Sequence, residues 1–343
     1  METGGNPPRR DGSGSEVRRF RRGRRLRETP AVRALVRETA LSAAHLVLPL
    51  FAVPGARREE PVSSMPGVRR LSPDLILREC EKAAALGVGG ALLFGVPDVK
   101  TGDASGAWDM AGPVPEAIRL IKRDLPGFPV ITDVCLCEYT ENGHCGFIRD
   151  GRIDNDLTLP ALARSALAHA GAGADFVAPS DMMDGRVGCL RDALDASGFA
   201  AVGILSYAVK YASAFYGPFR EAAGSAPSSG DRKSHQMDPA NLREAVLEAR
   251  SDLEEGADML MVKPAMWYLD VVRTLRDRFD EPIACYNVSG EYAAVKAAAA
   301  NGWLDERRTV LEALLSMRRA GADLLITYHA LDAAGWLRAE GKA

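Results

Sequence analysis

The stretch GADMLMVK, residues 256–263, places Gly-Ala-Asp directly before an apolar run that finishes on a lysine. Glycine is favoured at the left-handed position that ends a helix, and a run of Met, Leu and Val suits a buried strand. The tripeptide GAD also precedes apolar runs at residues 173–175 and 321–323. A repeated helix end followed by a strand predicts repeated βα units.

Apolar runs of strand length recur along the chain, with amphipathic stretches between most of them. In one such stretch, Leu242, Val246, Leu247 and Leu253 are expected to share one helix face. The eight apolar runs lie at residues 46–53, 91–96, 129–136, 176–178, 202–207, 259–262, 283–288 and 324–328. They predict an α/β fold, the (β/α)8 or TIM barrel. The alternative is an open doubly wound sheet, but no Gly-x-Gly-x-x-Gly follows the first run and no Walker-type loop is present.

Composition limits the classes of protein to which the 343-residue chain can belong. Apolar residues make up 47% and charged residues 26%, with a net charge of −3, as in ordinary globular proteins. No run of 18 apolar residues is present, so we expect no membrane span. The net charge offers no general attraction to nucleic acid. Six cysteines, three of them clustered, do not form a disulfide framework and indicate a reduced, cytoplasmic protein.

The N-terminal region is strongly basic, with nine arginines between residues 9 and 27. Such an arm can bind nucleic acid or target an organelle, but the stretch before it is rich in Gly, Pro and Ser, and no apolar signal segment follows. We expect a flexible, solvated arm or a contact to another subunit. The predicted division is an extended arginine-rich arm at residues 1–25 and a single barrel domain at residues 26–343.

Polar and reactive side chains stand where the predicted strands end. Active sites of this fold lie at the carboxyl ends of the strands. We therefore expect one rim of the barrel to collect Asp133, Cys135, Cys137, Ser180, Asp181, Lys210, Lys263, Ser289 and Tyr328.

The segment DVCLCEYTENGHCGF, residues 133–147, carries three cysteines. Cys135 and Cys137 are two apart on a strand end and so point to the same face, and Cys145 returns after a loop. Three thiolates suit zinc and leave a fourth position open, as in catalytic sites. The alternatives are plain buried thiols or a closed Cys3His site completed by His144.

Two lysines, Lys210 and Lys263, each follow an apolar strand. Burial favours the neutral amine, and a second ammonium nearby acts in the same direction. A neutral amine attacks a ketone to form a Schiff base. Either lysine alone could instead be an ion-paired side chain, but two on adjacent strand ends favour the catalytic interpretation.

The segment SSGDRKSHQMDP, residues 228–239, is rich in small and basic residues. It is typical of a mobile loop that closes over a site, although a plain surface loop has the same composition. Together with Arg220, its arginine Arg232 could bind a substrate carboxylate.

Taken in order, these motifs resemble one family, 5-aminolevulinic acid dehydratase, also called porphobilinogen synthase, from about Phe20 to Leu337. The matching segments are RRLRETPAVRALVRET (24–39), SSMPGVRRLSPD (63–74), DVCLCEYT (133–140), GHCG (143–146), APSDMMDGRV (178–187), SYAVKYASAFYGPFR (206–220), MLMVKPAMWYLD (259–270) and NVSGEY (287–292). The resemblance implies condensation of two 5-aminolevulinate molecules into porphobilinogen, with loss of two waters, in tetrapyrrole (heme) biosynthesis.

The resemblance also implies roles for individual residues. Lys263 and Lys210 would form Schiff bases with the two substrates, and Cys135, Cys137 and Cys145 would hold a catalytic Zn2+. Asp133 and Ser180 would lie near the substrate amine. The remaining pocket residues would be Arg220, Arg232 and Gln236 for one carboxylate, Ser289 and Tyr328 for the other, and Tyr216 and Phe219 as walls.

Similarity to this family further implies a homo-octamer, in which the N-terminal arm wraps a neighbouring subunit. Some bacterial relatives bind an activating Mg2+ through a helix glutamate, and Glu248 falls at that position. The sequence departs from relatives at Asn142, Ser234, His235 and His329, where other residues are usual. The Ser234-His235 pair makes the secondary zinc site of some animal members unexpected here.

Two other functions were weighed against this one. Another lysine Schiff-base aldolase on a TIM barrel would account for one reactive lysine, but not for two together with zinc. A zinc-stabilised scaffold whose arginine arm binds nucleic acid would need a closed metal site and no substrate adduct on lysine. We therefore expect a small-molecule enzyme that binds neither nucleic acid nor membranes.

Overall fold

The computed structural model describes residues 21–228 and 230–341. The chain divides into two units between Ala40 and Leu41. The described part of the first unit holds a 3-10 turn, η1 (Gly23–Leu26), and a short helix, α1 (Pro30–Leu35). Thr29 caps α1, because its hydroxyl accepts a hydrogen bond from the Val32 amide at 3.2 Å. Most of the predicted arm lies outside the described residues, so its boundary at residue 25 stays a prediction.

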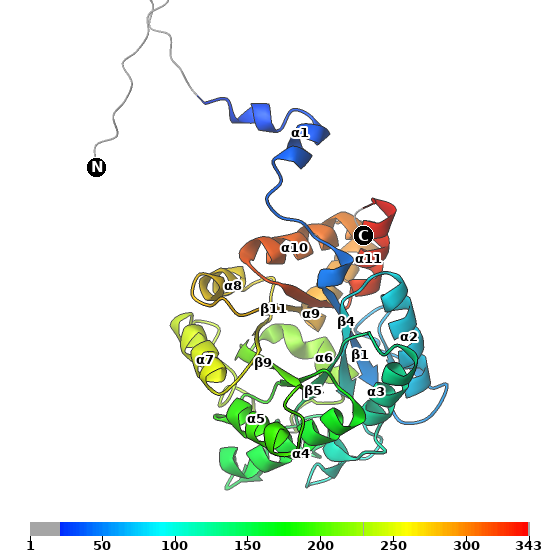
Figure 1. Cartoon of the computed structure of the whole chain (residues 1–343), viewed down its shortest axis with the longest axis vertical. Helices are drawn as coiled ribbons and strands as arrows, with labels where there is room; N and C mark the ends of the chain where they lie inside the picture. Colours follow the sequence, from blue (N-terminus) through cyan, green and yellow to red (C-terminus); the bar gives the residue numbers. More distant parts are fainter. Residues whose placement is uncertain (1–20, 229, 342–343) are drawn as a thin grey trace, which may run out of the picture. The chain divides into compact units, whose positions relative to one another are not determined.

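Eight parallel strands form the centre of the second unit (Figure 1). They are β1 (Leu46–Ala52), β4 (Gly90–Gly95), β5 (Val130–Val134), β8 (Phe176–Pro179), β9 (Gly203–Lys210), β10 (Met259–Lys263), β11 (Ile283–Asn287) and β12 (Leu324–Thr327). Pairing of Leu46 with Leu325 and of Val47 with Ile326 closes the sheet between β1 and β12. The predicted (β/α)8 barrel is therefore confirmed.

Helices surround the strands, and Figure 1 shows them as an outer ring. They are α2 (Pro73–Ala85), α3 (Pro113–Asp124), α4 (Asn155–Ala172), α5 (Arg186–Ala196), α7 (Arg243–Glu254), α8 (Leu269–Arg276), α10 (Glu306–Ala320) and α11 (Ala330–Ala339). The expected single apolar face of α7 is wrong at Leu242, which precedes the helix and is 39% exposed, and at Leu247, which is 63% exposed. Successive helix residues are rotated by about 100°, so Leu247 turns away from the barrel while Val246 and Leu253 pack against it.

The three GAD repeats end helices and also tie neighbouring strands together. Gly173, Gly256 and Gly321 have φ angles of 108°, 104° and 123°, in the region that favours glycine. The aspartates that follow accept hydrogen bonds from amides in the first two residues of adjacent strands. The pairs are Asp175 with Val130 (2.7 Å), Asp258 with Ile204 (2.7 Å) and Asp323 with Ile283 (2.9 Å). Each repeat thus sets both the helix end and the strand alignment.

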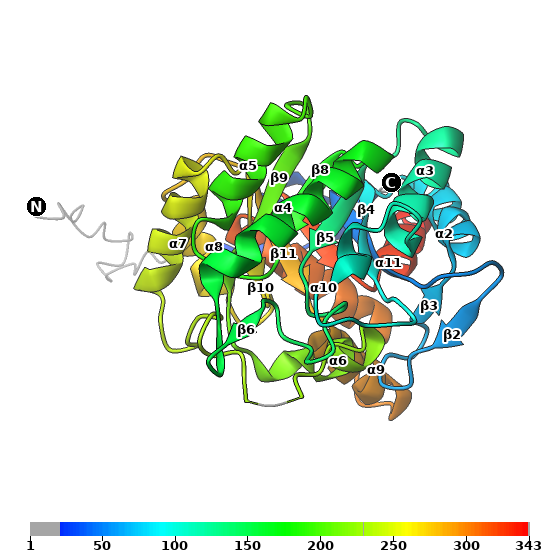
Figure 2. The same cartoon turned by 90° about the horizontal axis from the view of Figure 1, so that it is seen from below.

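Additional elements follow the carboxyl ends of several strands. They are β2 (Glu59–Pro61), β3 (Arg69–Leu71), η3 (Ser105–Trp108), β6 (Ile148–Arg149), β7 (Arg152–Ile153), η4 (Ala214–Tyr216), α6 (Gly217–Ala222) and α9 (Ser289–Ala300), while η2 (Ala43–His45) precedes β1. Figure 2 shows β2, β3, β6, α6 and α9 on one side of the barrel. This side is the one on which the fold predicts the site.

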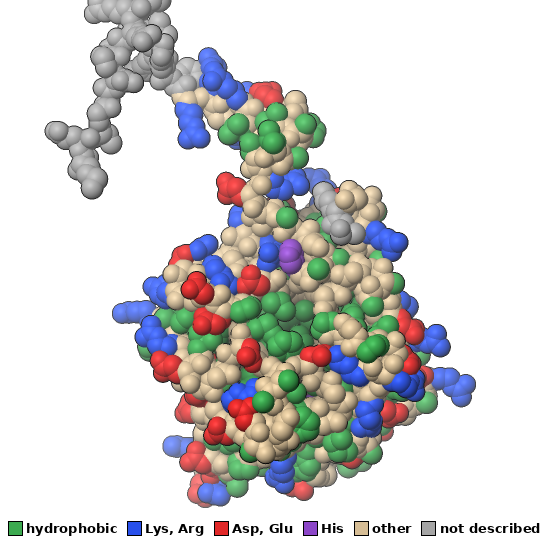
Figure 3. Space-filling view, viewed as in Figure 1, with side chains coloured by type: hydrophobic (Ala, Val, Ile, Leu, Met, Phe, Trp, Pro, Cys, Tyr) green, Lys and Arg blue, Asp and Glu red, His purple; other side chains and the backbone are tan. Residues whose placement is uncertain are grey.

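The apolar core has a layer inside the barrel and a layer between strands and helices. All eight barrel strands contribute to the inner layer, which includes Phe51, Phe94, Tyr207 and Tyr286. On the face of the molecule in Figure 3, positive and negative side chains are interspersed. Within residues 21–228 and 230–341, no helix is long and apolar enough to cross a membrane.

Candidate active site

Two buried lysines face each other at the carboxyl ends of neighbouring strands. Lys210 ends β9, Lys263 ends β10, and the two are partners in the strand register. They are 4% and 5% exposed. The ring of Tyr207 lies near both amines, with its centroid 5.7 Å from the Lys210 Nζ and 5.0 Å from the Lys263 Nζ. The predicted convergence of two lysines is therefore observed.

Aromatic rings surround the Lys263 amine. Its Nζ lies 4.5 Å from the ring centroid of Tyr286, 4.9 Å from that of Phe219 and 5.4 Å from that of Tyr216. Burial, and then the charge of Lys210, lower the pKa of Lys263 to about 7. A substantial fraction of this side chain is therefore a neutral, nucleophilic amine near neutral pH.

The Lys210 amine has a different environment. It donates a hydrogen bond to the Ser180 carbonyl. Burial lowers the pKa of Lys210, but the neighbouring Cys145, Cys135 and Cys137 act in the opposite direction, and the pKa is raised overall. The two lysines thus differ in their affinity for protons although they are neighbours.

A buried carboxyl group, Asp133 on β5, completes this part of the site. Its Oδ2 accepts a hydrogen bond from the Ser180 hydroxyl at 3.1 Å, and its Oδ1 has no partner. Burial and the nearby Glu138 carboxylate raise the pKa of Asp133 to about 8. Asp133 can therefore take up or release a proton near neutral pH.

Three cysteine thiols form a buried cluster beyond the end of β5. The Sγ atoms of Cys135, Cys137 and Cys145 all lie within 4.8 Å of one another, and none is in a disulfide. The Cys135–Cys137 separation is 3.3 Å. Hydrogen bonds from the other two thiols lower the pKa of Cys145 well below its usual value. A compact set of three soft donors fits a zinc ion. His144 is not part of this cluster.

The basic residues predicted to bind a carboxylate lie beside the cysteine cluster. Arg232 is buried and donates from Nη2 to the carbonyls of Gly143, at 2.8 Å, and Ser225, at 2.5 Å. Burial and the charge of Arg232 lower the pKa of Arg220. Buried nitrogens without hydrogen-bond partners remain on Arg220 (Nε), Arg232 (Nε) and Gln236 (Nε2). Such donors are costly to leave unpaired, so they favour an anionic or polar ligand.

The other predicted carboxylate-binding residues lie across the site. The Ser289 hydroxyl accepts a hydrogen bond from the Phe219 amide at 2.9 Å. The hydroxyls of Tyr328 and Tyr286 are 3.0 Å apart. Tyr216 donates from its hydroxyl to the Lys263 carbonyl at 3.1 Å. These contacts hold in place the side chains and loops that pack near Lys263.

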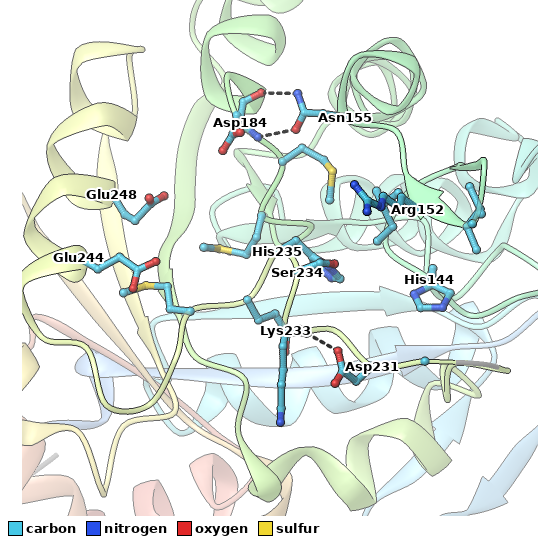
Figure 4. A pocket seen from close by; sticks show the side chains of 18 residues that line it. His144, Arg152, Asn155, Asp184, Asp231, Lys233, Ser234, His235, Glu244 and Glu248 are labelled. Atoms are coloured by element: carbon cyan, nitrogen blue, oxygen red, sulfur yellow. Dashed lines mark hydrogen bonds between the residues drawn. The ribbon is translucent and has the colours of Figure 1, made fainter.

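Glu248 lines a cavity of about 780 Å3, which Figure 4 shows; Gln236 lines it too, whereas neither of the paired lysines does. It projects from α7 together with Glu244, and the loop that carries His235 runs between them and His144. Burial raises the pKa of the Glu248 carboxyl. Glu248 is therefore separate from the paired lysines, but it shares its cavity with the loop that follows Gly230.

Three further residues that shape the site were not predicted from the sequence. Tyr207 is fully buried, and its ring lies beside both lysines. Glu291 accepts hydrogen bonds from the amides of Met266 at 2.9 Å and Val288 at 3.0 Å, and so joins the loops after β10 and β11. Tyr286 packs on Lys263. Tyr207 lies in the apolar run before Lys210, and this position was the one hint of its role in the sequence. Without the strand register, the sequence does not show whether its side chain points toward the lysines.

The fold and the site define a (β/α)8-barrel enzyme with paired buried lysines beside a three-thiol cluster. The family model "Delta-aminolevulinic acid dehydratase" matches residues 20–336, and the chain belongs to this family. This confirms the family predicted from the motifs.

Curated relatives and a solved structure agree with this assignment. The chain is 53% identical to the delta-aminolevulinic acid dehydratase of Halalkalibacterium halodurans, over 94% of this chain and 98% of the relative. It is 52% identical to that of Synechococcus elongatus, over 92% of this chain and 98% of the relative. It is also similar to the Toxoplasma gondii delta-aminolevulinic acid dehydratase (porphobilinogen synthase) crystallised with the reaction product porphobilinogen. That match has a TM-score of 0.93 and 44% identity, and covers 98% of this chain and 97% of the other.

Proposed function

We propose that the protein condenses two molecules of 5-aminolevulinate into porphobilinogen, with release of two waters, as the names of its relatives imply. The observation that carries this proposal is the pairing of Lys210 and Lys263 on adjacent strand ends beside three thiols. The lysine aldolase alternative does not call for a second buried lysine.

Lys263 is the side chain best suited to attack first, because its pKa of about 7 leaves much of it neutral. Its amine adds to the substrate ketone, and loss of water forms an imine. Lys210 holds the second substrate in the same way. Holding two identical molecules in different poses is chiefly a proximity effect, worth up to about 7–11 kcal/mol in favourable cases.

The later steps make two bonds between the substrates. Loss of a proton from a carbon next to one imine allows that carbon to attack the imine carbon of the other substrate. Loss of a second proton from the attacking carbon then expels the lysine from the attacked carbon as a free amine and leaves a carbon–carbon double bond. The free amine of the attacked substrate next adds to the remaining imine carbon, and the second lysine leaves as a free amine. A final proton loss yields the aromatic ring. Asp133 is the proposed acceptor of these protons, and its pKa of about 8 and its hydrogen bond from Ser180 support this role.

We assign a zinc ion to Cys135, Cys137 and Cys145. When bound, zinc supplies a Lewis acid beside the second substrate. Arg220, Arg232 and Gln236 are the proposed ligands of one substrate carboxylate, and Ser289 and Tyr328 of the other. Their unpaired or exchangeable donors support these roles.

The proposal extends to an activating Mg2+ at Glu248, a homo-octamer and a cytoplasmic location. Glu244, Glu248 and Asp184 line one cavity, and carboxylate oxygens suit Mg2+. Exposed large apolar side chains, including Leu35, Leu247 and Trp303, support subunit contacts. Six cysteines without a disulfide support a reducing compartment.

The test is porphobilinogen formation by the purified, reduced protein before and after a chelator, and again with zinc restored. We expect product to disappear and then return. Cys145→Ser should lose both zinc and activity, whereas Cys189→Ser, outside the cluster, should keep both. Product that survives complete zinc removal would make the thiol site structural. Absence of product with any metal would overturn the proposed function.

A further inference from the structure

Three potential metal ligands meet away from the lysines and the thiols. Glu306 begins α10, while His329 precedes and Asp332 lies within the first turn of α11. One ligand atom of each lies within 4.8 Å of the others. A histidine with two carboxylates is a common ligand set for zinc and similar divalent ions.

His329 is the second, independent sign of a ligand at this place. Its side chain is 2% exposed, yet neither ring nitrogen has a hydrogen-bond partner. The Tyr292 ring packs against it, with centroids 4.4 Å apart. A buried imidazole with two unpaired ring nitrogens can offer a metal ion the lone pair that it requires.

A positive charge already lies between the carboxylates. The Lys296 Nζ is 2.5 Å from a Glu306 oxygen and 3.5 Å from an Asp332 oxygen. The cluster is thus arranged around a cation, and Lys296 would compete with a metal for it. Lys296 and Glu306 also line a cavity of about 570 Å3. A long, flexible lysine side chain has room there once it leaves the carboxylates.

We propose that Glu306, His329 and Asp332 form a further metal site for a divalent ion of the zinc class, which displaces Lys296 into the adjoining cavity. The site differs from the thiol cluster in its nitrogen and oxygen ligands. Because Lys296 competes for the same carboxylates, the affinity of the site for the metal ion depends on how strongly each of the two cations binds them. The inference rests on this cluster alone and does not depend on the proposed function.

The test uses Co2+ as the probe on the full-length protein, in excess Mg2+ to occupy sites with oxygen ligands only. Bound cobalt per chain is measured by equilibrium dialysis, and thiolate-to-cobalt absorbance reports the cysteine cluster separately. We expect His329→Phe to lose one equivalent of cobalt while the thiolate absorbance is unchanged. We expect Lys296→Met to tighten the same equivalent roughly tenfold or more, because it removes a competing charge within 4 Å.

His169→Phe is the matched control, since His169 is also buried with both nitrogens unpaired but is not part of this cluster. It should keep the full cobalt content. Misfolding cannot produce the tighter cobalt binding expected for Lys296→Met. This variant therefore still tests the proposal if the His329→Phe protein is unstable. Equal cobalt content in wild type and His329→Phe, or unchanged affinity in Lys296→Met, would overturn the proposal.

Discussion

The low pKa of Lys263 leads to a quantitative prediction about where substrate is trapped and at what pH. An ordinary lysine, with a pKa of 10.5, is neutral in about one molecule of 3000 at pH 7. With a pKa of about 7, roughly half of Lys263 is neutral at that pH. This difference corresponds to about 5 kcal/mol between its two protonation states. Burial is the larger cause and the Lys210 charge the second.

The perturbation is Lys210→Met, with Lys210→Arg as the control that keeps the positive charge. Substrate is added between pH 5 and 10, the imine is reduced with borohydride, and the modified Lys263 peptide is quantified by mass spectrometry. In the Lys210→Arg protein we expect half-maximal trapping near pH 7. In Lys210→Met the midpoint should rise by roughly 1–3 pH units, since a like charge has been removed. It should stay below 10.5 because burial persists.

Two results would refute this reasoning. One is a midpoint above pH 9 in the wild type, which would mean that burial does not favour the neutral amine. The other is the same midpoint in Lys210→Met and Lys210→Arg, which would mean that the neighbouring charge has no effect on Lys263.

The pH dependence of the free energy of unfolding provides a second measurement of the low pKa of Lys263. The pKa of Lys263 is about 7 in the folded protein and 10.5 when unfolded, so between these values the unfolded chain binds more protons. The contribution of Lys263 to the free energy of unfolding therefore rises with pH across that window. Lys263→Met should stabilise the protein by up to about 4 kcal/mol at pH 7 and by little at pH 10.5. Denaturant unfolding at both pH values tests this, and an equal effect at the two would contradict it.

Two further predictions concern substrate binding and packing. Arg232→Lys should raise KM for 5-aminolevulinate roughly 10- to 100-fold, because charge-assisted hydrogen bonds are lost. The control is Lys233→Met, at an exposed position of the same loop, which should leave KM unchanged. Equal KM values for the two variants in steady-state kinetics would count against binding of a carboxylate by Arg232. Gly290→Ala should destabilise the protein by about 1–3 kcal/mol, because a Cβ there would lie 2.5 Å from the Phe215 carbonyl oxygen. Gly335 lies in open space on α11, so Gly335→Ala should instead stabilise the protein by about 0.5–1 kcal/mol. Denaturant unfolding measures both variants. A Gly335→Ala protein less stable than Gly290→Ala would show that the space around each glycine does not decide the change in stability.

Local patterns accounted for much of the barrel. The eight apolar runs agree with the observed strands to within a few residues, because strands covered on both faces are apolar throughout. The GAD repeats marked helix ends correctly, since a left-handed residue there favours glycine. Their aspartates could not be interpreted from sequence, because the amides that they bind belong to strands far away in the chain.

The sequence alone determined the fold class and the family, and it predicted which two lysines and which three cysteines would gather, since these features depend on residue type and short-range spacing. Only the tertiary structure decided how Tyr207 and Lys210 share one side of β9. Simple alternation would place residues three apart on opposite faces. The pairing between β9 and β10 shifts by one residue, from Ser206 opposite Leu260 to Val209 opposite Val262. A bulge of this kind re-aims the side chains that follow it, and so Lys210 faces Lys263.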